Sequence, residues 1–181
     1  MKHIAVFCSA QNISEAYTKP AEEFGRLMVA HGYDLVWGGS DKGLMSILAT
    51  AVQQNGGKLV GVSIPYFEDV ARKNADEMIL AKDLSERKTT MLARSDAIVM
   101  LVGGVGTLDE LMEIVERKKQ KEHNKPIVIL NTNNFYEGLR MLLDRMLDEG
   151  FIPKDVGELA HVVNTPQEAI EYIDAALART G

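Results

Sequence analysis

The segment DAIVMLVGGVGTLDELMEIVER, residues 96–117, carries the pattern that decides the fold. Residues 97–102 form a continuous apolar run without alternation, which is typical of a strand covered on both faces in a parallel sheet. The run ends at Gly103 and Gly104. After Gly106 and Thr107 the apolar residues follow the helical spacing i, i+3, i+4 and i+7, at positions 108, 111, 112 and 115. The segment therefore predicts a strand, a glycine-rich turn and a helix.

A glycine-rich turn before a helix is a candidate anion site. Backbone N–H groups can point into open space where Cβ atoms are missing, and the helix N-terminus adds partial positive charge. Such sites most often bind phosphate. Thr107 can cap the helix or donate its hydroxyl to the same anion. The alternative is an ordinary strand-to-helix turn in which Thr107 is the cap and the acidic Asp109 and Glu110 complement the helix dipole.

The rest of the chain alternates strand and helix patterns. Apolar runs predict six further strands, at residues 3–9, 35–37, 59–64, 77–81, 126–130 and 160–163. Helical periodicity predicts helices at residues 14–31, 83–95 and 135–149, another that ends at Gly56 and Gly57, and a last one that Thr165 and Pro166 begin. This alternation predicts one domain, residues 1–181, with a doubly wound α/β fold: a parallel sheet of about seven strands with helices on both faces.

A second glycine-rich turn follows the predicted strand at residues 35–37. Gly38, Gly39 and Ser40 occupy it, and Ser9 begins a polar loop after the first strand. Ligands of open parallel sheets bind at the carboxyl ends of the strands, where neighbouring turns meet. We therefore expect these residues to lie near the turn at 103–107. A tight turn without a ligand is the alternative.

Two cations lie on the inward stripe of the helix predicted at 83–95. Leu84, Met91 and Leu92 mark that stripe, and Arg87 and Lys88 fall at i+3 and i+4 from Leu84. Buried charges need partners. The two cations therefore pair with carboxylates, line an anion pocket, or extend to the rim of the helix.

Composition excludes several classes of function. The net charge of −6 leaves no basic excess for a nucleic acid, and no apolar run reaches the length of about 18 residues that a membrane span requires. The four histidines are scattered, which argues against a metal site. The single cysteine, Cys8, lies in an apolar run, so we expect a core residue in a reducing, cytoplasmic compartment.

The combined motifs resemble a known family. Residues 86–88 with Met91, then 95–97, then Gly-Gly-Val-Gly-Thr-Leu-Asp-Glu at 103–110, resemble the R-K…P-G-G-x-G-T-x-x-E signature of the "lonely guy" (LOG) proteins. These are cytokinin-activating nucleoside 5′-monophosphate phosphoribohydrolases, long mislabelled as lysine decarboxylases. The resemblance implies a Rossmann-like subunit, usually in a dimer or larger assembly. Its reaction is hydrolysis of the N-glycosidic bond of AMP or N6-modified AMP to a free base and ribose 5-phosphate, with no cofactor.

The resemblance also assigns roles to residues. Arg87 and Glu110 match the catalytic pair of the family, and Lys88 and Asp109 lie in its substrate-contact segments. The phosphate cradle corresponds to the turn residues Gly103, Gly104, Val105, Gly106 and Thr107, with Ser9, Gly39 and Ser40 in the neighbouring turns. Glu68 or Asp69 is a candidate further acidic contact. Glycosidic cleavage builds positive charge on the sugar, which a carboxylate stabilises, and an arginine can hold the phosphate.

Several positions depart from the family signature. Val102 replaces the proline before the double glycine, Ser40 stands where a third glycine is common, and Glu116-Arg117 replaces a Thr-Trp pair. The alternative to hydrolysis is therefore a protein of the same fold that binds or carries a nucleotide or phosphorylated cofactor without cleaving it. An amino-acid decarboxylase would need a lysine that holds pyridoxal phosphate, for which Lys88 is the candidate and has no nearby pyridinium partner. The charged inward stripe favours a homodimer with composite sites.

Overall fold

The computed structural model describes residues 2–152 and 156–179. Its strands are β1 (Lys2–Phe7), β2 (Tyr33–Trp37), β3 (Leu59–Ser63), β4 (Glu77–Leu80), β5 (Ala97–Met100), β6 (Ile127–Leu130) and β7 (His161–Val163). Its α-helices are α1 (Glu15–Ala30), α2 (Gly43–Gln54), α3 (Leu84–Ala93), α4 (Val105–Lys119), α5 (Glu137–Asp148) and α6 (Pro166–Ala178). Three short 3-10 helices are η1 (Pro65–Val70), η2 (Thr132–Asn134) and η3 (Val156–Glu158).

The described strands form one parallel sheet of seven strands in the order β4-β3-β2-β1-β5-β6-β7. The chain moves outward from β1 to β4 and then returns to pair β5 with β1 on its other side. This reversal is the topological switch point of a Rossmann-like doubly wound fold, so the predicted fold class is confirmed. The loops after β1 and β5 diverge there, at the edge where such folds bind ligands.

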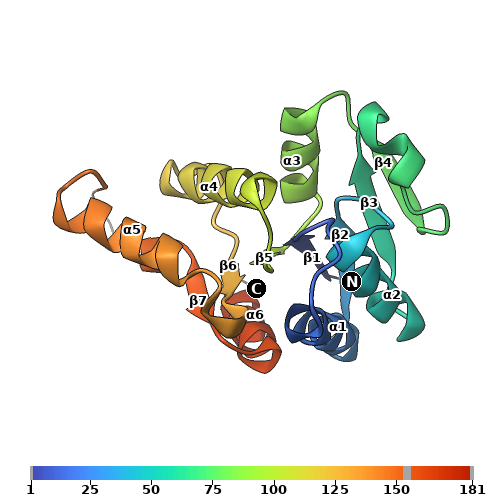
Figure 1. The fold of residues 1–181 in the computed structure, drawn as a ribbon, viewed down its shortest axis with the longest axis horizontal. Helices are drawn as coiled ribbons and strands as arrows, with labels where there is room; N and C mark the ends of the chain where they lie inside the picture. Colours follow the sequence, from blue (N-terminus) through green and yellow to red (C-terminus); the bar gives the residue numbers. More distant parts are fainter. Residues whose placement is uncertain (1, 153–155, 180–181) are drawn as a thin grey trace.

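Helices lie on both faces of the sheet (Figure 1), and an apolar cluster fills the space on each face. Side chains of β1 alternate between them: Ile4 and Val6 pack with α1, α2 and α6, whereas Ala5 and Phe7 pack with α3 and α4. Cys8 is buried in the first layer, as predicted for a core residue. The alternation arises because successive strand residues point to opposite faces.

Local sequence signals place most helix ends. Thr165 accepts a hydrogen bond from the Glu168 N–H at 3.2 Å, and the Glu168 carboxylate accepts one from the Thr165 N–H, which completes a capping box at α6. The predicted start of this helix is confirmed. The helix predicted at 135–149 is α5, closed by Gly150 at φ +79°. Pro153, in the loop expected after it, lies outside the described residues.

One expectation about a single side chain is wrong. Leu84, predicted to face inward, is 51% exposed, and Ser85 and Glu86 beside it are exposed as well, because the covered part of α3 begins only at Arg87. The connection from β3 to β4 contains the 3-10 helix η1. Between residues 2 and 152 and between 156 and 179, no helix has both the length and the apolar character needed to cross a membrane.

Candidate functional site

Three loops meet at the carboxyl edge of the sheet, and Ser9 connects them. The Ser9 N–H donates to the Val102 carbonyl at 3.1 Å, and the Ser9 carbonyl accepts from the Met45 N–H at 3.3 Å. The loop after β1 is therefore bound to the ends of β5 and to the start of α2. Gly43 allows this approach, because a Cβ there would lie 2.4 Å from the backbone of Ala10. Of the predicted turns, Ser9 is thus joined to the segment just before the turn at 103–107 and to the start of the helix that follows the turn at 38–40.

Arg87 lies at the centre of this edge. Its Nε donates to the Val62 carbonyl at 2.9 Å, and its Nη1 donates to Glu110 Oε1 at 2.8 Å. Both side chains of this ion pair are about nine-tenths buried, with 6% of the arginine and 10% of the glutamate side chain exposed. Nη2 lies against the second glycine turn, where a Cβ on Gly38 would be 2.1 Å away. Gly38 therefore leaves the space that the guanidinium occupies.

The pKa of Glu110 is set by two opposing effects. Burial raises the pKa of this carboxyl group, and the nearby charge of Arg87 opposes the rise without cancelling it.

Lys88, which follows Arg87 in α3, also pairs with carboxylates. Its Nζ donates to Asp109 Oδ2 at 2.8 Å and lies 2.5 Å from Glu113 Oε2. Burial alone would lower the pKa of Lys88, but its two carboxylate partners raise it overall. Arg87 and Lys88 thus pair with carboxylates of α4, one of the arrangements that the sequence left open.

The turn at residues 103–107 differs from the expected turn in one respect. Thr107 does not cap the helix, because α4 begins at Val105 and its N-cap is Gly104. The Leu108 N–H donates to the Gly104 carbonyl at 3.1 Å, so the three preceding N–H groups have no helical acceptor. Thr107 is buried against Gly103, where a Cβ would lie 2.1 Å from the threonine hydroxyl oxygen. Val105 and Gly106 are exposed.

A cavity of about 820 Å³ opens beside Arg87, between the loop after β1, the second glycine turn and η1. It falls in the size range of small-molecule sites. Among the predicted residues, Gly38, Ser40 and Arg87 line it; Gly39 lies in the same turn at φ +74°, a conformation that favours glycine. Glu110 lies behind Arg87, and neither the turn at 103–107 nor Ser9, Lys88 or Asp109 is part of the lining. Phe67 and Val70 of η1 line the cavity, whereas the candidate acids Glu68 and Asp69 do not.

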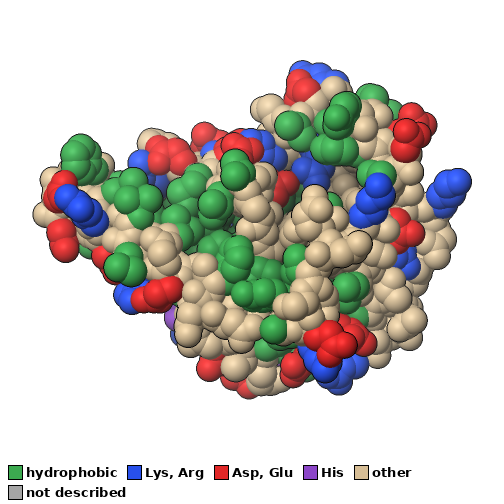
Figure 2. Space-filling view, viewed as in Figure 1, with side chains coloured by type: hydrophobic (Ala, Val, Ile, Leu, Met, Phe, Trp, Pro, Cys, Tyr) green, Lys and Arg blue, Asp and Glu red, His purple; other side chains and the backbone are tan. Residues whose placement is uncertain are grey.

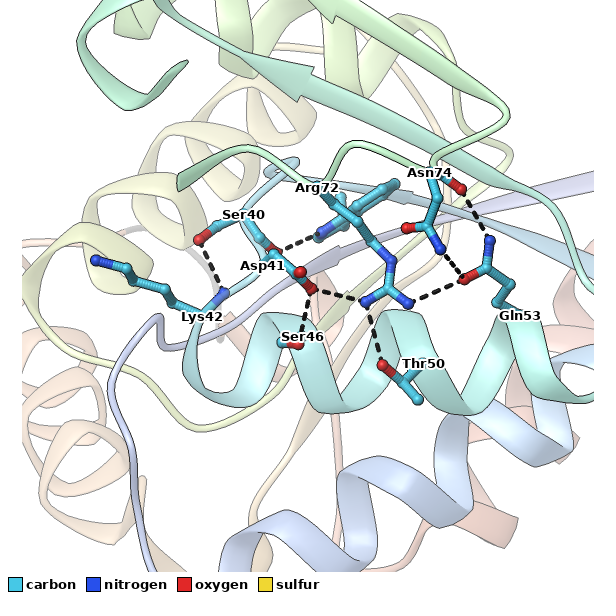
Figure 3. Close-up of polar contacts among 9 residues, drawn as sticks. Ser40, Asp41, Lys42, Ser46, Thr50, Gln53, Arg72 and Asn74 are labelled. Carbon is cyan, nitrogen blue, oxygen red and sulfur yellow. Dashed lines mark hydrogen bonds and ion pairs between the residues drawn. The ribbon is translucent and has the colours of Figure 1, made fainter. Parts of the chain in front are cut away.

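A polar cluster that the sequence did not reveal lies at the second glycine turn (Figure 3), and part of it lines this cavity. Asp41 and Lys42 line the cavity, and Arg72 reaches across the turn to bind Asp41. The position of Asp41 could have been inferred, because it follows β2 at the predicted ligand edge. Arg72 gave no such signal, because it lies 31 residues from its partner in sequence.

A family model described as "Possible lysine decarboxylase" matches residues 45–173. The cytokinin riboside 5′-monophosphate phosphoribohydrolase of Mycobacterium tuberculosis is 36% identical over 170 residues, covering 92% of this chain and 90% of that protein. The chain belongs to the LOG family. A further LOG-family relative in Oryza sativa subsp. japonica, named a probable cytokinin riboside 5′-monophosphate phosphoribohydrolase, is 34% identical over 96% of this chain and 71% of its own length. The resemblance inferred from the motifs is confirmed.

This LOG-family chain also resembles a solved structure with another description. The molybdenum cofactor carrier protein MCP from Chlamydomonas reinhardtii has a TM-score of 0.73 to it and 26% sequence identity, over 98% of each chain. The overall fold of the LOG-family chain is therefore shared with a protein that is described as a carrier.

Proposed function

We propose that this protein hydrolyses the N-glycosidic bond of AMP or of an N6-modified AMP. Water adds its oxygen to C1′ of the ribose, the bond from C1′ to the base nitrogen breaks, and the base leaves with a proton, giving a free base and ribose 5-phosphate. The proposal is supported by LOG-family membership and by the names of the relatives.

The buried pair between Arg87 and Glu110 is the observation that carries the proposal. Cleavage of a glycosidic bond passes through a transition state with positive charge on the sugar. A buried carboxylate stabilises that charge strongly, because the local dielectric is low, and can also orient the attacking water. Arg87 lines the cavity and has Nη2 free of hydrogen bonds to the described residues, so it can bind the nucleotide and set the position of Glu110.

The turn at residues 103–107 completes the proposed site by binding the phosphate. Its N–H groups at Val105, Gly106 and Thr107 precede the first helical hydrogen bond and so can donate to phosphate oxygens. Ser9, Gly39 and Ser40 would contact the substrate from the neighbouring turns. Lys88 and Asp109 would act beside the catalytic pair, with the lysine charge supporting the phosphate end. Neither role requires a metal or a cofactor.

Release of free base from AMP and from isopentenyladenosine monophosphate tests the proposal. Replacement Glu110→Gln should lower turnover by about 10²-fold or more while nucleotide binding is retained, because the amide cannot carry the negative charge that the transition state requires. Chromatography of the products measures turnover, and calorimetry measures binding. Glu171→Gln, which changes an exposed carboxylate on α6, is the matched control and should leave both unchanged. Tight binding by the wild type without any release of base would contradict hydrolysis.

A carrier of a nucleotide or phosphorylated cofactor is the second candidate function. The similarity to the molybdenum cofactor carrier favours it, as does a cavity whose lining includes Arg87 but not Glu110. The same variant separates the two functions: a carrier keeps its ligand affinity in Glu110→Gln and shows no turnover to lose. Loss of measured turnover in this variant would reject the carrier.

We also propose that the chain acts as a single-domain, cytoplasmic homodimer or larger assembly of identical chains. The charged stripe of α3 no longer supports this, because its cations pair within the chain. The support now comes from α5, which has no buried residue and carries the exposed side chains Met141 and Leu142. Hydrophobic side chains gather along this helix (Figure 2). A buried free Cys8 fits a reducing compartment.

A further inference from the structure

Arg72 is a buried cation outside the proposed catalytic pair. It follows η1 and extends over the second glycine turn toward α2 (Figure 3). Its Nη1 donates to Asp41 Oδ1 at 2.8 Å and to Thr50 Oγ1 at 3.1 Å, and its Nη2 donates to Gln53 Oε1 at 2.9 Å. One side chain therefore connects the segment after η1, the turn after β2 and the C-terminal half of α2.

Backbone hydrogen bonds also join the end of η1, residues 70–72, to the second glycine turn, residues 39–41. The Arg72 N–H donates to the Gly39 carbonyl at 2.8 Å, and the Asp41 N–H donates to the Val70 carbonyl at 2.7 Å. Ser40 and Ala71 form an antiparallel bridge between them. Both segments contribute to the cavity wall, Ser40 and Asp41 from one and Val70 from the other. The wall therefore depends on this contact.

The charge of Asp41 gives the contact a second consequence. Its side chain is 50% exposed and lies in the cavity wall, whereas only 8% of the Arg72 side chain is exposed. A free carboxylate at this position would repel a phosphate ester that enters the cavity. Arg72, which is not part of the cavity lining, neutralises the Asp41 carboxylate through Oδ1, and the Ser46 hydroxyl donates to the same Oδ1 atom at 2.9 Å. The remaining cations of the lining, Lys42 and Arg87, then meet the ligand without a competing anion.

The hydrogen bonding of Arg72 is incomplete. Its Nε is buried and has no hydrogen-bond partner among the described residues. An incompletely satisfied buried charge is a poor source of stability, and apolar replacements of buried ion pairs are often neutral or stabilising. The role of Arg72 is therefore better explained by the segments that it positions and the charge that it neutralises.

We infer that Arg72 is a positioning residue that sets the affinity of the cavity for phosphate esters by neutralising Asp41 and fixing η1 against the turn. This inference rests on the proposed function, because it assumes that the ligand of the cavity is a phosphate ester. It assigns Arg72 no part in the chemical step, which belongs to side chains of α3 and α4.

The variant Arg72→Met tests the inference, because methionine fills much of the space and carries no charge. We expect KM and Kd for AMP to rise about tenfold and kcat to stay within about twofold. Affinity for adenosine, which lacks the phosphate, should change much less. Arg72→Lys should recover part of the loss, since it restores a cation. Lys73→Met removes the same charge from the adjacent exposed position and is the matched control.

The double variant Arg72→Met with Asp41→Asn separates charge from simple loss of structure. With the carboxylate removed, we expect AMP affinity to return to within about threefold of the wild type. A double variant as weak as Arg72→Met, with a matching fall in the thermal midpoint, would overturn the charge role. Unchanged Kd for AMP in Arg72→Met would overturn the inference as a whole, and so would a wild type that binds neither AMP nor inorganic phosphate. Binding of AMP without hydrolysis by the wild type would reject only the proposed reaction.

Discussion

Glu110 shows how two physical effects compete at a single residue. Burial disfavours its charge, and the guanidinium of Arg87 at 2.8 Å favours it. Removing one partner of such a pair leaves an uncompensated buried charge, which typically costs about 3–5 kcal/mol. The site therefore keeps a carboxylate in an environment of low dielectric at the expense of stability, as is common for groups with a chemical role.

The raised pKa of Glu110 predicts a particular pH dependence of stability. The folded state holds this proton more tightly than the unfolded state, whose value is near 4.5, so the folded state binds more protons in the window just above 4.5. Stability then falls as pH rises through the folded pKa. We expect the free energy of unfolding of the wild type to fall relative to that of Glu110→Gln as pH rises above 4.5. Urea unfolding of both proteins at several pH values measures their free energies of unfolding. A wild-type value that rises relative to that of Glu110→Gln as pH increases would show that the charge of Arg87 outweighs burial.

The turn between β2 and α2 is the element that makes room for the catalytic pair. Arg87 reaches the cavity only because Gly38 has no side chain, and the loop after β1 packs closely only because Gly43 has none. Gly43 also has φ +54°, which favours glycine. The glycines of this turn are therefore explained by packing against α3 and the first loop as well as by any contact with a ligand.

Replacement Gly38→Ala should displace the guanidinium of Arg87. The new Cβ would lie 2.1 Å from Nη2, and the arginine would have to move away from the cavity. We expect kcat/KM for AMP to fall by about 10- to 100-fold, because a shift of about 1 Å at a catalytic group can have that effect. Steady-state kinetics and thermal unfolding measure it. Gly138→Ala, in α5 with open space around the position, is the control, and activity in Gly38→Ala equal to this control would contradict the prediction.

In the molecule as a whole, α5 is the one α-helix of the described residues that has no buried residue. Figure 1 shows this helix extending beyond the sheet at the side of β6 and β7. Its apolar residues Met141 and Leu142 and the nearby Phe151 are exposed by 63%, 51% and 76%. Hydrophobic side chains gather along α5 and in the hollow between it and α4 (Figure 2). Contiguous apolar surface of this kind commonly marks an interface.

We expect the wild type to be at least a dimer in solution and Leu142→Asp to be a monomer. A charge in the centre of an apolar interface would have to be desolvated without a partner, which strongly disfavours association. Size-exclusion chromatography with light scattering should give at least twice the chain mass of 20.0 kDa for the wild type. Leu80→Asp, at an exposed position on β4 at the opposite edge of the sheet, is the matched control. A monomeric wild type would reject the dimer.

The sequence by itself determined the features that depend on neighbours in the chain. The apolar run at 97–102, the glycines after it and the pattern at 108–115 specify a strand, a turn and a helix, because periodicity and turn chemistry act over a few residues. The start of α6 at Thr165 and Pro166 was readable for the same reason. The alternation of such units, with the preference for right-handed crossovers, then leaves few arrangements other than a doubly wound sheet.

Only the tertiary structure decided which of these residues meet. Glu110 lies 23 residues from Arg87, and Asp41 lies 31 residues from Arg72, so their pairing depends on how α3, α4 and η1 pack on the sheet. The stripe of α3 placed Arg87 and Lys88 inward correctly, but it also placed Leu84 inward, since periodicity does not show at which residue the covered part of a helix begins. The lining of the cavity could not be predicted either, because its wall is made of segments that approach one another only after the chain has folded.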